Sequence, residues 1–170
     1  MVDKLFGEIM EGKLPAVYED SLVFAVLPEH PANPGHIMII PKKQYVILEQ
    51  VPDLEIQQIF AIINKLSMSL FDSLHAQGTN IIIQNGHTAG QEHNHLIIHL
   101  IPRFANDGMS FNWQPKQLTE EQMSTIELKY KQFTKTIGII HQDKPKEPEK
   151  KPEPITGEEN YWVKQLRKIA

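Results

Sequence analysis

Three histidines stand at alternate positions near the middle of the chain, with an isoleucine at the position where a fourth would fit. They are His93, His95 and His99, and Ile97 lies between the last two. In an extended strand alternate residues face the same side, so we expect these four side chains to share one face. A neutral imidazole offers one ring nitrogen with a lone pair and one N–H that can donate to an oxygen. Next to the glycine-rich turn at 86–91, this cluster indicates a site that handles phosphate groups.

The same histidines raise the alternative of a metal site. His93 and His95 could converge on one ion, and His99 or His87 could complete a tetrahedron. However, His95 and His99 are four residues apart, about 13 Å along a strand, which is too far for one ion without a bulge. We therefore predict no intrinsic metal site and no cofactor.

The elements that must position this cluster follow from apolar periodicity and turn residues. A short helix is expected at 6–10, and a long helix at 52–75 with apolar residues every three or four positions. Thr119 followed by Gln122 predicts a capped helix that continues to about 136. Short runs rich in β-branched residues predict strands at 17–19, 22–27, 36–40, 80–84 and 94–101.

Three motifs follow one another in order between residues 4 and 104. A hairpin at 20–27 comes first, Pro34-Gly35-His36 leads into a strand that ends in Ile-Pro-Lys, and Ala-Gly-Gln precedes the spaced histidines, which end in Pro102-Arg103. Together they resemble the histidine-triad (HIT) family of nucleotide hydrolases and transferases. The resemblance implies an α+β fold, with an antiparallel sheet of about five strands and one long and one short helix. It also implies a homodimer.

Alignment on Pro102-Arg103 places the first triad histidine at His95, the third at His99 and the middle one at Ile97. In the family the middle histidine is the nucleophile that attacks the α-phosphate, and isoleucine has no lone pair with which to do so. The resemblance therefore implies catalytic positions at His95, His99 and the substituted Ile97. Since neighbours on one face are about 6.6 Å apart, His95 or His99 could replace the nucleophile only if the substrate were bound in a shifted pose.

The resemblance implies two further groups of site residues. Those expected to bind the nucleotide or its phosphate are His36, Gln84, Asn85, Gly90, Gln91, Glu92 and His99, helped by backbone amides of the turn. Those expected to line the base pocket are Phe6, Ile9, Phe24, Val26 and Leu27. Two positions depart from the family pattern: Pro28 replaces an aspartate that takes the ribose hydroxyls, and Glu92 replaces a serine that contacts phosphate. A carboxylate at residue 92 would repel phosphate if it faced the pocket. We expect the side chain of His30 to be exposed to solvent.

Three interpretations of function remain open. The first is a HIT-like protein that binds a nucleoside phosphate, with a purine nucleotide favoured, and is degenerate as a hydrolase or transferase. The second is an active nucleoside phosphoramidase or dinucleoside-polyphosphate hydrolase that uses a displaced histidine. The third, which Pro28 and Glu92 favour, is a structural adaptor with a vestigial pocket.

Composition agrees with a small domain followed by an extension. The chain has 170 residues, of which 41% are hydrophobic and 22% charged, and its formal net charge of −4 disfavours a nucleic-acid partner. It has no cysteine, and no apolar run approaches the length of a membrane span, so we expect a cytoplasmic protein without a membrane partner.

Changes in composition divide the chain into four parts. We predict a HIT-like domain at 1–104, a helical extension at 105–138 that packs on it, and a linker rich in proline, lysine and glutamate at 139–159. A short amphipathic helix at 160–170 ends the chain. We expect this last helix to dock on the protein's own dimer or on another protein.

Overall fold

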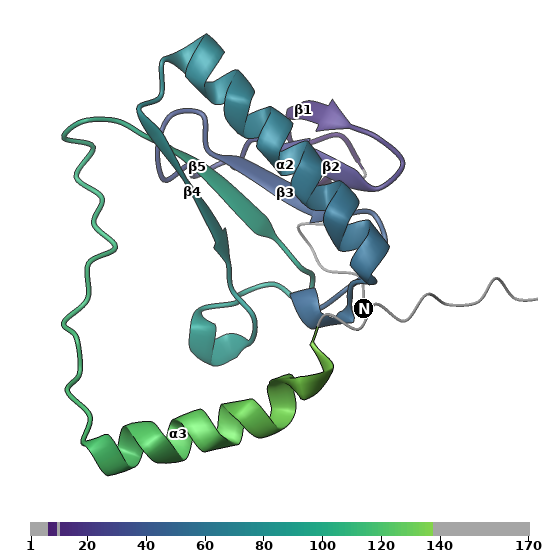
Figure 1. Ribbon diagram of the computed structural model, residues 1–170. Coiled ribbons are helices and arrows are strands. Elements are labelled where there is room, and N and C mark those ends of the chain that lie inside the picture. Colours follow the sequence, from purple (N-terminus) through teal and green to yellow (C-terminus); the bar gives the residue numbers. More distant parts are fainter. Residues whose placement is uncertain (1–6, 10, 138–170) are drawn as a thin grey trace, which may run out of the picture. The chain divides into compact units, whose positions relative to one another are not determined.

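The computed structural model describes residues 7–9 and 11–137 (Figure 1). The predictions for Phe6, for the linker at 139–159 and for the terminal segment at 160–170 lie outside the described residues. The chain divides into two compact units, Met1–Asn112 and Trp113–Ala170. This boundary falls eight residues after the predicted end of the first domain at 104. Within the described residues, no helix is both long and apolar enough to cross a membrane.

The first unit is built on one antiparallel sheet with the strand order β1-β2-β3-β5-β4. Its strands are β1 (Ala16–Glu19), β2 (Val23–Val26), β3 (Ile37–Pro41), β4 (Gly78–Ile83) and β5 (Ile98–Arg103). Two short 3-10 turns, η1 (Leu48–Gln50) and η2 (His87–Ala89), lie in the connections, and residues 7–9 are helical. The predicted α+β class with a five-stranded antiparallel sheet is confirmed.

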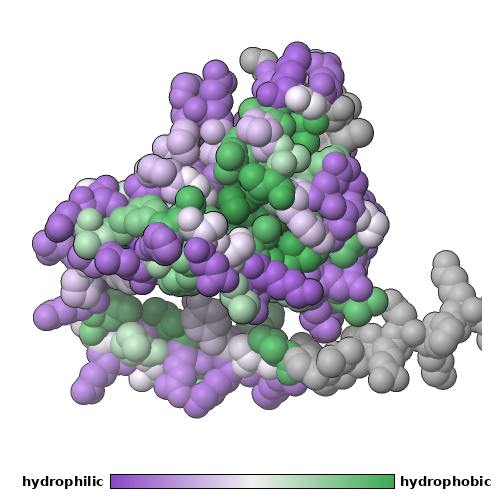
Figure 2. Space-filling model, turned by 90° about the horizontal axis from the view of Figure 1, so that it is seen from above, coloured by the Kyte–Doolittle hydropathy of each residue, from purple (hydrophilic) through white to green (hydrophobic). Residues whose placement is uncertain are grey.

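The long helix α2 (Asp53–Leu74) lies across one face of the sheet (Figure 1). It begins directly after Pro52, carries Asp53 and Glu55 in its first turn, where carboxylates favour the positive end of the helix dipole, and ends at His75 in a left-handed conformation. The predicted helix at 52–75 is therefore confirmed to within one residue at each end. Part of its apolar surface stays exposed, including Phe60, Met68, Phe71 and Leu74. Seen from above, hydrophobic residues form an area bordered by hydrophilic ones (Figure 2).

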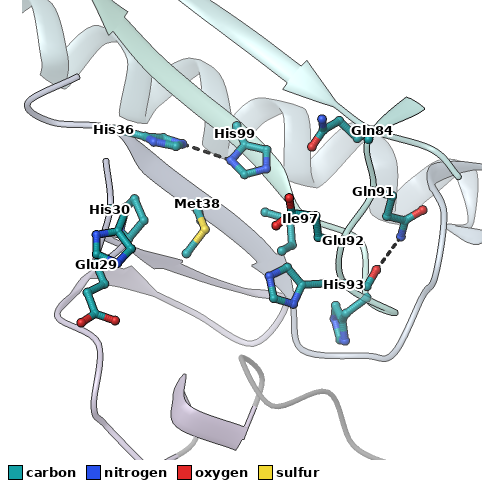
Figure 3. Close-up of a pocket in the computed structure, with 13 residues that line it drawn as sticks. Glu29, His30, His36, Met38, Gln84, Gln91, Glu92, His93, Ile97 and His99 are labelled. Carbon is teal, nitrogen blue, oxygen red and sulfur yellow. Dashed lines mark hydrogen bonds between the residues drawn. The ribbon is translucent and has the colours of Figure 1, made fainter. Parts of the chain in front are cut away.

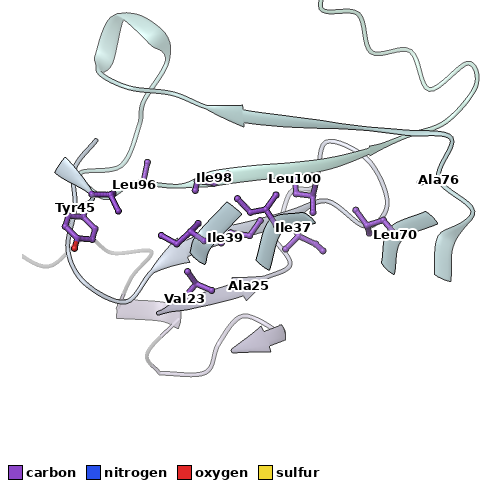
Figure 4. Close-up of a cluster of buried hydrophobic side chains, with 13 residues drawn as sticks. Val23, Ala25, Ile37, Ile39, Tyr45, Leu70, Ala76, Leu96, Ile98 and Leu100 are labelled. Atoms are coloured by element: carbon purple, nitrogen blue, oxygen red, sulfur yellow. The ribbon is translucent and has the colours of Figure 1, made fainter. Parts of the chain in front are cut away.

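A buried apolar cluster joins α2 to the sheet (Figure 4). Its members on the strands alternate in sequence, because successive side chains of a strand point to opposite faces. The strands contribute Val23, Ala25, Ile37, Ile39, Ile98 and Leu100, and the helix contributes Ile59, Ile63 and Leu70. The intervening strand residues therefore face away from α2, on the side where the candidate site lies.

The opposite face of the sheet carries a second, smaller cluster. It consists of Ile9, Phe24, Val26, Met38 and Ile40, with Leu14 and Ile97 packed against it. Met38 of β3 is directly opposite His99 of β5 in the register of the two strands. Alternation on β3 and β5 thus brings a methionine and a histidine together beside this apolar cluster.

The strand predicted at 94–101 is shifted, because β5 begins only at Ile98. Its partner β3 ends at Pro41, which has no N–H to continue the ladder, and the Pro41 carbonyl accepts from the ring of His95 instead. The N–H of Leu96 donates to the Tyr45 carbonyl at 2.7 Å. Residues 93–97 therefore precede β5 as a loop. The predicted shared face is nevertheless confirmed, because His93, His95 and Ile97 line the same cavity as His99, whereas Leu96 joins Ile98 and Leu100 in the cluster on the α2 side.

The second unit contains α3 (Glu120–Phe133) and the short turn η3 (Thr134–Thr136). The Thr119 hydroxyl accepts from the Gln122 N–H, and the Gln122 side chain accepts from the Thr119 N–H. This reciprocal pair is the predicted capping box, and it satisfies two backbone donors at the start of the helix. The packing of the extension on the first domain stays a prediction.

Candidate functional site

A cavity of about 440 Å³ opens on the face of the sheet opposite α2 (Figure 3). Its volume lies in the range of small-molecule sites. All but one of the predicted catalytic and phosphate-binding residues line it, namely His36, Gln84, Gly90, Gln91, Glu92, His95, Ile97 and His99. The loop at 93–97 thus keeps the predicted common face, although it is not part of the strand.

The best-defined polar feature of the cavity is a pair of linked imidazoles. The N–H of Ala32 donates to His36 Nδ1 at 3.1 Å, so the His36 proton resides on Nε2. That nitrogen lies 3.1 Å from His99 Nδ1 and donates to it (Figure 3). His99 must therefore carry its own proton on Nε2, for which the described part of the chain offers no further partner. We call the hydrogen-bonded pair of His36 and His99 the imidazole relay. It leaves the Nε2–H of His99, which can donate to a ligand.

Burial keeps both imidazoles neutral at neutral pH. It lowers the pKa of His36 from 6.5 to about 4, and the neighbouring His99 lowers it further. The pKa of His99 is also lowered, first by burial and then by the neighbouring imidazole of His93. The pair therefore acts through its N–H groups and not as a permanent positive charge.

The first predicted triad histidine, His95, is only 4% exposed. Its Nε2 lies 2.8 Å from the Pro41 carbonyl oxygen, which can only accept, so this nitrogen carries a proton and donates. The contact ties the loop at 93–97 to the end of β3. One of the two nitrogens of His95 is therefore occupied by the backbone.

An aliphatic side chain occupies the position predicted for the nucleophile. Ile97 is partly buried, lines the cavity and packs against the apolar cluster that contains Phe24 and Met38 (Figure 3). It has no atom that can donate, accept or attack. The floor of the cavity is apolar here, between the imidazole pair and the loop.

Gln91 lines the cavity, but its amide is occupied by the loop itself. Its Oε1 accepts from the Gly86 N–H at 2.7 Å, and its Nε2 donates to the Val46 carbonyl at 2.7 Å. The same Nε2 also donates to the His93 carbonyl at 2.8 Å (Figure 3). The prediction that this amide offers hydrogen bonds to a phosphate was wrong, because both of its N–H groups and its oxygen have backbone partners. Gln91 shapes the loop that borders the cavity.

The backbone of the glycine-rich turn is engaged in a similar way. The amides of Ala89 and Gln91 donate to the Gly86 carbonyl, and the amide of Gly90 donates to the His87 carbonyl. These three N–H groups satisfy the turn itself, so the prediction that the turn directs its amides at an anion does not hold for them.

A neutral amide remains available at Gln84. Within the described residues it has no hydrogen-bond partner, and it lines the cavity next to Gly90. A Cβ on Gly90 would lie 2.6 Å from Gln84 Nε2, and Gly90 has a φ of +89°, which side chains rarely adopt. The absence of a side chain at Gly90 therefore makes the space that Gln84 occupies.

Asn85 is the one predicted phosphate-binding residue that does not line the cavity. Its Oδ1 accepts from the Leu48 N–H at 3.2 Å, and its Nδ2 donates to the Glu49 carboxylate at 2.9 Å. The side chain therefore joins the start of η1 to the loop after β4. Because Gln84 and Asn85 are consecutive in an extended stretch, they point in opposite directions, and only Gln84 lines the cavity.

The predicted base pocket is divided between the two faces of the sheet. Ile9, Phe24 and Val26 lie together and line a separate hollow of about 280 Å³. Leu27 instead packs against the cluster on the α2 side. Residues 26 and 27 are consecutive, so extended backbone sends them to opposite faces, and the grouping of all four was wrong.

Several residues of the cavity wall were not predicted from the sequence. Met38 lines it, and strand alternation from His36 could have identified this side chain. Pro28, Glu29 and His30 also line it, from the connection between β2 and β3. His30 is exposed, as expected, but it borders the cavity, and no pattern in the sequence indicates that this connection reaches the site. Within the described residues, no three histidine or carboxylate side chains come together to hold a metal ion.

The geometry of this site and the fold agree with the comparisons to known proteins. The HIT domain matches residues 11–106, more than half of the chain, and the chain therefore belongs to the HIT family. This confirms the family resemblance seen in the motifs.

Individual relatives give the same result. An uncharacterised HIT-like protein of Methanocaldococcus jannaschii is 40% identical over 106 residues, which cover 61% of this chain and 81% of the relative. An adenylylsulfatase of Arabidopsis thaliana is 32% identical over 107 residues, which cover 62% of this chain and 54% of the relative. The crystal structure of a Streptococcus mutans protein superposes on this chain with a TM-score of 0.70 and 32% sequence identity. The match covers 78% of this chain and 86% of the S. mutans chain.

Proposed function

We propose that this protein binds a nucleoside phosphate, with a purine nucleotide favoured, and does not turn it over. The observation that carries the proposal is the pairing of an intact imidazole relay at His36 and His99 with an aliphatic side chain at Ile97. The relay ends in an N–H that suits a phosphate oxygen, and the Gln84 amide adds a neutral donor and acceptor. The similar adenylylsulfatase supports an adenylyl group as the ligand.

The alternative of a displaced histidine nucleophile finds little support in the same contacts. Both nitrogens of His36 are engaged, and Nδ1 of His99 accepts from His36 while its Nε2 carries the proton. Nε2 of His95 donates to the Pro41 carbonyl. An attacking nitrogen needs a lone pair about 3 to 3.5 Å from phosphorus, in line with the leaving group. The engaged nitrogens of His36 and His99 do not present one, and the lone pair on Nδ1 of His95 belongs to a side chain that is only 4% exposed and tied to Pro41.

The proposal is tested by calorimetric binding of adenosine monophosphate and by turnover of an adenosine phosphoramidate. We expect the unmodified protein to bind and not to hydrolyse, and we expect an Ile97→His variant to hydrolyse. An Ile97→Asn variant is the matched control, because it adds polarity at the same position without an imidazole lone pair. Turnover by the unmodified protein would refute the proposal, and absence of binding would favour the adaptor.

The assembly of the protein stays a prediction. The family resemblance implies a homodimer, and the apolar positions of residues 160–170 suggest a protein partner for that segment. Light scattering after size-exclusion chromatography measures the first directly, because a dimer has twice the chain mass of 19.5 kDa.

A further inference from the structure

The charges around the cavity are unusual for a site that binds phosphate. Among the lining residues there is no lysine or arginine, and the two formal charges are the carboxylates of Glu29 and Glu92. Figure 3 shows Glu92 near Ile97, and Glu29 beside His30 on the other side. Both glutamates are exposed, and neither has an ion-pair partner among the described residues. The rim of the cavity is therefore negative on two sides.

Among the described residues, the two lysines that follow β3 are paired with other carboxylates and not with Glu29 or Glu92. Lys42 and Lys43, at the end of β3, form ion pairs with Glu19 and Glu55 and lie over the rings of Phe24 and Tyr45. Of the two histidines of the relay, His36 is buried and His99 half-buried, and their lowered pKa values keep both neutral at neutral pH. The described wall of the cavity thus offers neutral donors for one phosphate group, at His99 and Gln84, and no lysine or arginine for a second or third.

We propose that Glu29 and Glu92 make this cavity select nucleoside monophosphates over nucleoside di-, tri- and dinucleoside polyphosphates. The inference rests on the proposed function and assigns its substrate class. Each added phosphate brings further negative charge toward two carboxylates that have no ion-pair partner among the described residues, and repulsion between like charges grows as the number of charges grows. In this proposal the first phosphate accepts from the His99 N–H, and the further phosphates of a longer chain come closer to the exposed carboxylates that line the same cavity.

The selectivity is measured by calorimetry with adenosine monophosphate and adenosine triphosphate, without divalent cations and at low ionic strength. We expect the monophosphate to bind about tenfold more tightly than the triphosphate, because the additional negative charges of the triphosphate are repelled by the two carboxylates. In a double variant, Glu29→Gln with Glu92→Gln, we expect this ratio to approach one through a gain in triphosphate affinity. Both side chains are exposed, so the variant should keep its fold, which circular dichroism checks.

A matched control separates local charge from net charge. Asp72→Asn removes one carboxylate from α2, which packs on the opposite face of the sheet, and should leave the ratio unchanged. Added salt should bring the ratio of monophosphate to triphosphate affinity closer to one in the unmodified protein, since salt screens exposed charges. The inference fails if the triphosphate binds as tightly as the monophosphate, or if the double variant keeps the original ratio. If neither nucleotide binds at all, the proposed function fails together with the inference.

Discussion

Replacement of Gln91 by alanine should destabilise the protein strongly, although the residue is polar and borders a cavity. Its side-chain amide makes three hydrogen bonds of 2.7 to 2.8 Å, with the Gly86 N–H and with the carbonyls of Val46 and His93. These bonds join the turn at 86–91 to the segment after β3 and to the loop that leads to β5. Alanine removes all three and leaves their partly buried backbone partners without replacement.

The magnitude follows from the number of bonds. A hydrogen bond within a protein contributes about 0.5 to 1.5 kcal/mol net, so the loss of three should lower the free energy of unfolding by about 2 to 4 kcal/mol. That is a large share of the roughly 5 to 15 kcal/mol that stabilises a typical domain. A Gln91→Glu variant should behave similarly, since a carboxylate of the same shape cannot donate to two carbonyls.

Urea denaturation followed by circular dichroism measures this free energy, and Gln84→Ala is the matched control. Gln84 lines the same cavity but has no hydrogen-bond partner among the described residues, so its removal should change the free energy of unfolding by less than about 0.5 kcal/mol. The same control should weaken binding of adenosine monophosphate. If the two variants are equally stable, the distinction between an amide that holds the loop and an amide that faces the ligand is refuted.

Three further predictions concern stability. The pKa of His36 falls from 6.5 to about 4 on folding, so between these pH values only the unfolded chain takes up a proton at this residue. The free energy of unfolding should therefore decrease as pH falls from 6.5 to about 4. His36→Gln should reduce this pH dependence, which urea titrations at about pH 7 and about pH 5 measure. Arg103 holds the pKa of Asp107 far below 3.8, so this carboxylate stabilises the fold above that pH and loses its effect as pH falls through the lowered value; Asp107→Asn should lower the melting temperature at neutral pH. Ile98 is fully buried beneath α2, and Ile98→Ala should cost about 2 to 5 kcal/mol, measured by urea denaturation against the exposed control Ile81→Ala.

Local periodicity was sufficient for most of the framework. The α2 helix was predictable because apolar residues recur at its helical period and Pro52 precedes it. The α3 capping box was predictable because Thr119 and Gln122 have the required spacing. The start of β5 was not, because it depends on where β3 stops supplying partners, at Pro41. Strand ends of this kind are properties of the pair and not of one segment.

The sequence by itself determined the family of this chain and the residue types at its candidate site. Its motifs place it in the HIT family, and they put isoleucine at residue 97 between two retained histidines. These conclusions depend only on residue types and their order, which the sequence states directly.

The tertiary structure alone decided what each polar side chain does. Gln84 and Gln91 are the same residue type on the border of one cavity, yet the first is available to a ligand and the second is occupied by backbone groups of Gly86 and Val46. The role of Glu29 likewise depends on the path of the connection from β2 to β3, which brings it to the cavity. A hydrogen bond needs a partner within about 3 Å, and such partners come from segments far apart in the chain that only the folded protein brings together.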